Sequence, residues 1–250
     1  MAARRVSASS LQEQANDFAA SISRVVSAFT GVEHPFVATA LEDRVTVRYA
    51  PARQAGGAGI PLKVEGDLLL TLNVTFDCTW DSKQHYLAVE KFDVAVYPLA
   101  RITKEPLFRY EFARSMTPGV PCSHLQVHAH RDSFTHLLGH AGERSRRAKR
   151  RVRRDLEQIP AVSEFHFPLG GPRFRPALED ILEVLHEEFG LDIGASWSVV
   201  RDEARAEWRR RQVGTAVRDA PEEAVRVLRE LGYHVSGPPV PERIDKLTML

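Results

Sequence analysis

The chain has 250 residues, enough to bury a substantial core in one domain or in two. Its hydrophobic and charged fractions, 43% and 27%, are those of an ordinary globular protein, and its net charge of +1 excludes a chain that is basic over its whole surface. No run of about 18 apolar residues predicts a membrane span, and the first seven residues lack the apolar centre of a signal peptide, which favours a cytoplasmic location.

The first predicted element is an amphipathic helix. Ser10 is a suitable N-cap, apolar residues recur at helical spacing as far as Phe29, and Gly31 provides the stop. Strands follow, and the clearest is the strict alternation from Leu68 to Trp80. A change of apolar phase in the next strand predicts a bulge near Glu90. Five strands are predicted in total, at residues 45–49, 68–80, 86–97, 107–113 and 123–130, with a Gly/Ala loop at 52–60.

The second part of the chain has mainly helical patterns. An apolar stripe predicts a helix at 141–159, a short strand is expected at 165–167, and further helices are expected from 176, 197 and 219 onward. The predicted fold class is α+β: an antiparallel meander sheet of about five strands, with packed helices and a helical C-terminal half. We expect a helix-plus-sheet part at 1–140, a helical part at 141–236 that can share one domain with it, and a Pro-rich tail at 237–250.

One strand is rich in histidine. Because side chains alternate along a strand, His124, His128 and His130 share a face with Gln126, and His166 can join them if its own strand pairs nearby. Imidazole binds metals and transfers protons near neutral pH, so His124, His128 and His130 are candidate metal ligands and His128, His130 and His166 are candidate catalytic residues. No other cofactor is indicated. The alternative is a solvated strand face, since no recognised zinc signature is present.

Arginines are concentrated in the segment that follows, between Arg144 and Arg154. Guanidinium groups form paired hydrogen bonds with phosphates, and clustered arginines create a local positive field. Five of them are the candidate contacts for nucleic acid or an acidic protein partner: Arg146, Arg147, Arg150, Arg151 and Arg154. The alternative is a solvated helix that faces acidic neighbours.

Four short motifs follow one another between residues 86 and 190. They are Arg109-Tyr110-Glu111 on a strand, the histidine strand, Phe165-His166-Phe167-Pro168, and a helix that begins Leu178-Glu179-Asp180. This order resembles that of the TumE-like bacterial toxin–antitoxin proteins, which have an Arg-Tyr-Asp strand, a His-x-His element and a Leu-rich helix in that order. The chain is also similar to proteins of actinobacterial type, in keeping with its preference for arginine over lysine.

Three functions are consistent with these patterns. The leading hypothesis is a cytoplasmic bacterial accessory or toxin–antitoxin-like protein that binds nucleic acid or an acidic partner through the arginine-rich helix. The second is a small metal-assisted hydrolase or nuclease centred on the histidine strand. The third is a non-enzymatic structural or interaction protein. The sequence predicts no contact with a membrane.

Overall fold

The computed structural model describes residues 10–41, 43–53, 59–81, 84–98, 106–114, 122–127, 136–137, 140, 142, 144–145 and 175–247. The helix predicted at 141–159 and the short strand predicted at 165–167 therefore lie outside the described residues. Within the described part of the chain, no helix is both long enough and apolar enough to span a bilayer.

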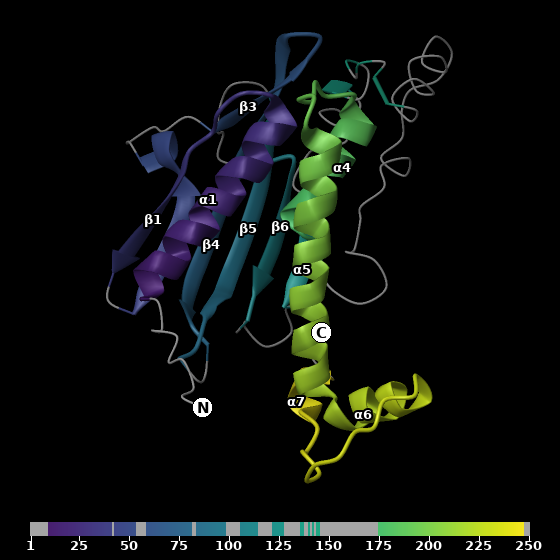
Figure 1. Ribbon diagram of the computed structural model, residues 1–250. Coiled ribbons are helices and arrows are strands. Elements are labelled where there is room, and N and C mark those ends of the chain that lie inside the picture. Colours follow the sequence, from purple (N-terminus) through teal and green to yellow (C-terminus); the bar gives the residue numbers. More distant parts are fainter. Residues whose placement is uncertain are drawn as a thin grey trace.

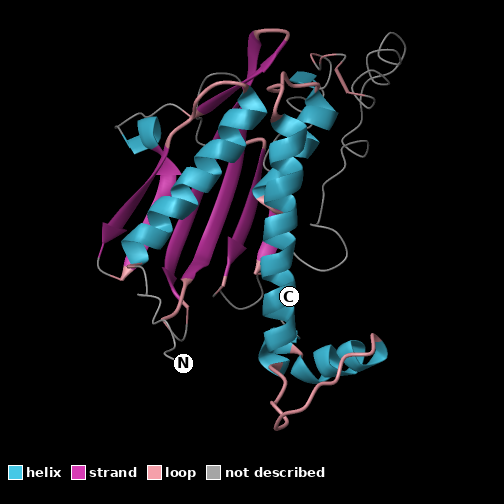
Figure 2. Ribbon diagram, in the orientation of Figure 1, coloured by secondary structure: helices cyan, strands magenta, loops and turns pink. Residues whose placement is uncertain are grey.

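The described strands form one antiparallel sheet of seven strands, with helices on one face (Figures 1 and 2). Its order is β1-β2-β4-β5-β6-β7, and β3 pairs with the first half of β4. The strands are β1 (Phe36–Leu41), β2 (Arg44–Tyr49), β3 (Ile60–Val64), β4 (Asp67–Trp80), β5 (Leu87–Pro98), β6 (Phe108–Ala113) and β7 (Ser123–Val127).

The prediction of about five strands was therefore too low, because it missed β1 and β3. β1 has no clear apolar alternation, and β3 contains Pro61, a residue that normally argues against a strand. A proline is tolerated there because, among the described strands, β3 has a hydrogen-bonded neighbour only on the side of β4. β2 pairs with the second half of β4, so β2 and β3 lie end to end along the same edge of this long strand.

The bulge predicted near Glu90 is confirmed. Asp77 of β4 is opposite Lys91, whereas the next residue, Cys78, is opposite Val89, so Glu90 is the extra residue on β5. The bulge returns the apolar side chains on both sides of it to the same face of the sheet. That face is covered by the helices.

The described helices are α1 (Leu11–Thr30), α4 (Leu178–Phe189), α5 (Trp197–Asp219), α6 (Pro221–Glu230) and the short α7 (Ile244–Leu247), with a 3-10 turn η1 (Ala50–Arg53) after β2. The predicted ends of α1 are confirmed. The Ser10 hydroxyl accepts a hydrogen bond from the Glu13 N–H, the Glu13 carboxylate accepts one from the Ser10 N–H, and Gly31 ends the helix in a left-handed conformation with φ 72°.

A single hydrophobic core joins both parts of the chain. It lies between the sheet and the helices α1, α4 and α5, which Figure 1 shows in front of the strands. Phe29 of α1 packs edge-on against Trp197 of α5, with ring centroids 4.9 Å apart. Residues from before 140 and from after 176 therefore contribute to the same apolar interior.

The C-terminal helices differ from the prediction. The helix expected from 219 onward is present as α6, and its spacing of Val225, Leu228 and Leu231 is that of a buried stripe, but α6 contains no buried residue, and Leu231 is 69% exposed. The long helix α5 continues past the end of the sheet, so α6 and α7 lie beyond the core that would otherwise cover them (Figure 1). The amphipathic pattern correctly predicts a helix here, but it cannot specify whether the same chain supplies a covering surface.

Candidate functional site

A row of polar side chains crosses the sheet on the face opposite the helices. Asp93 of β5 is directly opposite Glu111 of β6, and Glu111 is directly opposite His124 of β7. Directly paired residues on antiparallel strands have Cβ atoms about 4.5–5.5 Å apart, so the three side chains are neighbours. On β5 and β6 the flanking residues Phe92, Val94, Tyr110 and Phe112 pack in or against the apolar core, and this alternation directs the polar residues to the opposite face.

The row is held by charge contacts. The Glu111 carboxylate Oε2 lies 3.3 Å from His124 Nε2, and its Oε1 lies 3.4 Å from Arg109 Nη1. Arg109 also approaches Asp93, with Nε 3.7 Å from Oδ2. The guanidinium therefore lies beside both carboxylates, and the imidazole contacts one of them. All four side chains are largely or partly buried.

The two carboxyl groups differ in acidity. Burial and a hydrogen bond with Glu111 together raise the pKa of Asp93 to about 6, although the charges of Arg109 and Lys91 oppose this shift. Burial alone would also raise the pKa of Glu111, but the hydrogen bond from Asp93 and the charges of Arg109 and Lys91 bring it below its ordinary value. The pair thus consists of Asp93, which retains a proton in mildly acidic solution, and Glu111, which is ionised.

This asymmetry predicts a pH-dependent effect of Asp93→Asn on stability. The folded protein holds the Asp93 proton more tightly than the unfolded chain, so the stability linked to it is complete below about pH 4 and is lost as the pH rises through about 6. Asparagine does not ionise. From pH 4 to pH 8 the variant should therefore gain about 1–2 kcal/mol of unfolding free energy relative to the wild type.

Urea denaturation at several pH values measures this difference. Asp67→Asn, at an exposed position at the start of β4, provides the matched control. If the stability curves of the wild type and of Asp93→Asn stay parallel over this range, Asp93 is not the proton-holding group.

An open hollow lies next to the row. It has an empty volume of about 630 Å³, open solvent included, and is lined by polar residues of β4, β5 and β6. Lys91 and Arg109 supply positive charge there, Asp77 and Asp93 supply carboxyl groups, and Asn73, Thr75 and Tyr97 supply hydrogen-bonding groups. The hollow thus places two cationic side chains beside the Asp93–Glu111 pair.

Of the histidines predicted to form a site, the structure places His124 in this row. His124 shares a face with Gln126, as the alternation predicted. His124 is directly opposite Glu111 of β6, and Gln126 is directly opposite Arg109. His128, His130 and His166 lie outside the described residues. Among the described residues no group of three or more His, Cys, Asp or Glu side chains is arranged to hold a metal ion. His136 and His140 pack together at a separate hollow near Leu68.

The arginines proposed to bind nucleic acid, Arg146, Arg147, Arg150, Arg151 and Arg154, also lie outside the described residues. Arg144, at the start of the arginine-rich segment, is described. Its Nε lies 2.8 Å from Asp192 Oδ1, in an ion pair with the loop that follows α4.

Sequence reasoning did not identify Asp93 and Lys91 as site residues. The signal was present in β5, where Lys91 and Asp93 are charged residues at alternate positions, on the face opposite the apolar side chains. Only the strand register shows that Asp93 is opposite Glu111 and that Glu111 is opposite His124. That register cannot be derived from any one strand.

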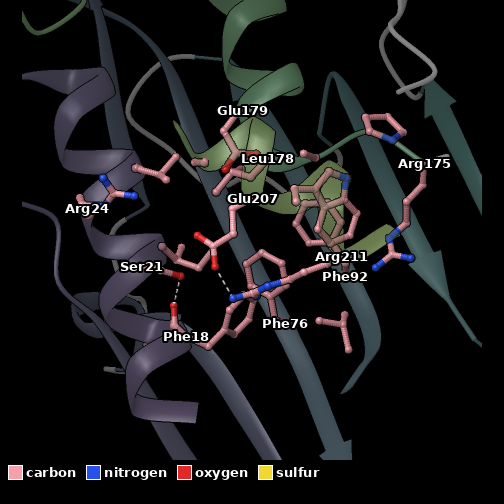
Figure 3. A pocket seen from close by; sticks show the side chains of 17 residues that line it. Phe18, Ser21, Arg24, Phe76, Phe92, Arg175, Leu178, Glu179, Glu207 and Arg211 are labelled. Carbon is pink, nitrogen blue, oxygen red and sulfur yellow. Dashed lines mark hydrogen bonds and ion pairs between the residues drawn. The ribbon is translucent and has the colours of Figure 1, made fainter. Parts of the chain in front are cut away.

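A second candidate site lies on the helix-covered side of the sheet (Figure 3). It is a cleft bounded by α1, by β4 and β5, and by α4 and α5, and it encloses about 660 Å³ including its open mouth. Its walls are mainly apolar and include the aromatic rings of Phe18, Phe76, Phe92 and Trp208. The sheet thus separates a polar site from an apolar one.

Comparison of the chain with protein-family models, with curated proteins and with solved structures found no match. The resemblance to TumE-like proteins therefore stays a prediction. Two of the residues that motivated it, Arg109 and Glu111, belong to the polar row.

Proposed function

We propose that the protein is a hydrolytic enzyme that cleaves RNA, with its reaction centre at Asp93, Glu111 and His124. The observation that carries the proposal is the convergence, on one partly buried patch, of a proton-holding carboxyl group, an ionised carboxylate, an imidazole and two cationic side chains. In RNA the adjacent 2′-hydroxyl supplies the nucleophile for phosphodiester cleavage. The reaction therefore requires a base that takes the proton of this hydroxyl, an acid that protonates the leaving oxygen, and cationic side chains that bind the phosphate.

We base the proposed catalytic roles on the order of the side chains in the row. Asp93 and His124 are on β5 and β7, two strand spacings or about 10 Å apart, with Glu111 between them. A phosphate above Glu111 would have His124 on one side and Asp93 on the other, which suits in-line displacement. Arg109 and Lys91 would bind its non-bridging oxygens.

In this mechanism His124 takes the proton of the 2′-hydroxyl, and Glu111 orients the imidazole and stabilises its charged form. The 2′-oxygen then attacks the phosphorus, and the bond to the 5′-oxygen breaks. Asp93 gives its proton to the leaving oxygen, so the products are a 2′,3′-cyclic phosphate and a free 5′-hydroxyl. The arginine-rich segment between Arg144 and Arg154 is proposed to contact the RNA backbone.

Cleavage of a fluorescent single-stranded RNA tests the proposal. We expect the wild type to cut RNA but not the same sequence made of 2′-deoxynucleotides. Glu111→Gln and His124→Gln should each lower the rate by about 10²–10⁴-fold, because each removes a group that moves or stabilises the transferred proton. The wild-type rate should fall as the pH rises above about 6, where Asp93 loses its proton.

The matched control for His124→Gln is His85→Gln, since His85 is exposed in the turn before β5. It should retain the wild-type rate, and the loss of activity in His124→Gln purified in the same way excludes a contaminating ribonuclease as the source. No cleavage by the wild type, or equal rates for the wild type and Glu111→Gln, would contradict the proposal.

A further inference from the structure

The aromatic cleft between α1 and α5 contains a cation that no described carboxylate neutralises. Three of the four arginines in and around the cleft form ion pairs: Arg24 with Glu203, Arg205 with Asp180, and Arg211 with Glu207. Arg175 is the exception within the described part of the chain. Its guanidinium carbon lies 3.7 Å from the centre of the Phe112 ring and 4.7 Å from that of Trp208, and its Nε is buried without a hydrogen-bond partner.

The same cleft contains an acidic group without an ion-pair partner among the described residues. Glu179, in the first turn of α4, is 7% exposed and points toward the cleft in Figure 3. Burial raises the pKa of Glu179 to about 7, well above the ordinary value of a carboxyl group. The charged groups that act on it are Asp180, Arg205 and Glu207.

These two groups respond to burial in different ways. A carboxyl group avoids the cost of a buried charge by binding a proton, as Glu179 does. Burial lowers the pKa of Arg175 to about 10, which still leaves the guanidinium charged at neutral pH. The uncompensated charge of the cleft is therefore positive, and an anion is the ligand that would neutralise it.

We propose that this cleft binds a small apolar carboxylate, such as a medium-chain fatty acid, with its carboxylate on Arg175 and its hydrocarbon chain against the aromatic walls. Phe18, Phe76 and Phe92 provide the apolar surface, and Trp208 joins this surface to the guanidinium. The exposed ion pair of Glu207 with Arg211 borders the opening (Figure 3).

Titration calorimetry with three ligands of equal chain length tests the proposal on the wild-type protein. Octanoate should bind at one saturable site, and octanol and octylammonium should bind at least about tenfold more weakly, because neither can pair with a guanidinium. Stronger binding of octylammonium would show that Glu179 is the ligand-binding charge and would overturn the proposal, as would no binding of octanoate.

Variants then test which side chain of the cleft binds the carboxylate of octanoate. Arg175→Met keeps the bulk of the side chain and should weaken octanoate binding by about 10–100-fold. Arg209→Met is the matched control, since Arg209 is exposed on α5 and does not line the cleft, and it should bind as the wild type does. Equal affinity of Arg175→Met and the wild type would overturn the proposal. If Arg175→Met does not fold, the ligand comparison on the wild type still decides.

Glu179 adds a second readout. As the pH rises from 6 to 8 its carboxyl group ionises and repels a bound carboxylate, so the affinity of the wild type for octanoate should fall. Glu179→Gln should remove this dependence, because an amide does not titrate. A wild-type affinity that rises over this range would contradict the binding of an anion in the cleft. Neither experiment depends on RNA cleavage, which is proposed for the opposite face.

Discussion

Replacing Trp197 by alanine should lower the free energy of unfolding by about 3–5 kcal/mol, among the largest effects of any single substitution in this protein. The indole is 1% exposed and packs edge-on against Phe29, and its Nε1 donates a hydrogen bond to Glu183 at 3.2 Å. Truncation removes this burial, leaves a cavity between α1 and α5, and removes one donor to a carboxylate that Arg201 also binds.

The cavity cannot close easily because the backbone nearby is already in close contact. A Cβ atom added to Gly194 would lie 2.4 Å from the Ala28 carbonyl oxygen, and the Gly194 N–H donates to the Phe29 carbonyl at 2.9 Å. Chemical denaturation measures the loss. Val199→Ala, on an exposed position of the same helix, should change the unfolding free energy by less than about 0.5 kcal/mol. A similarly small effect at Trp197 would contradict this packing.

Replacing Phe76 by alanine should cost about 3–5 kcal/mol for a different reason. Phe76 is 6% exposed at the centre of β4, stacks on Phe92 with ring centroids 4.5 Å apart, and meets Phe18 of α1 edge-on at 4.9 Å. The variant loses the burial of one large side chain and two aromatic contacts, each of which adds about 0.5–1.5 kcal/mol in other proteins.

Phe76→Leu retains most of the apolar volume, so it should recover at least half of this loss. Tyr233→Ala removes an aromatic ring at an exposed position and should be nearly neutral. Denaturation curves for the three variants distinguish a core strand from a peripheral one. If Phe76→Ala and Tyr233→Ala have equal effects, the contact of α1 with the sheet contributes little to stability.

The features that were predicted correctly depend on neighbouring residues in the chain. Ser10 and Gly31 end α1 through hydrogen bonds within a few residues, and the bulge at Glu90 is visible as a phase change within β5. β3 was missed because Pro61 argues against a strand when the partner strand is unknown. The exposure of α6 was missed because an amphipathic stripe predicts a surface to be covered and does not identify what covers it.

The candidate site was predictable only as far as it depends on neighbouring residues in the chain. The alternation around His124 correctly indicated which face of β7 is polar. It did not indicate Glu111 as the partner, since cross-strand pairing depends on the register of three strands. Nor did it indicate the cleft at Arg175, whose walls come from five segments between Phe18 and Arg211.

The packing of α1 against α5 has a consequence for the synthesis of the chain. Arg24 and its ion-pair partner Glu203 are 179 residues apart. At about 5–20 residues per second, α1 leaves the ribosome roughly 10–35 s before α5 is translated. During that interval the Phe29 side of α1 has no indole to cover it, so nascent chains that stall before α5 present an apolar surface to chaperones and to one another.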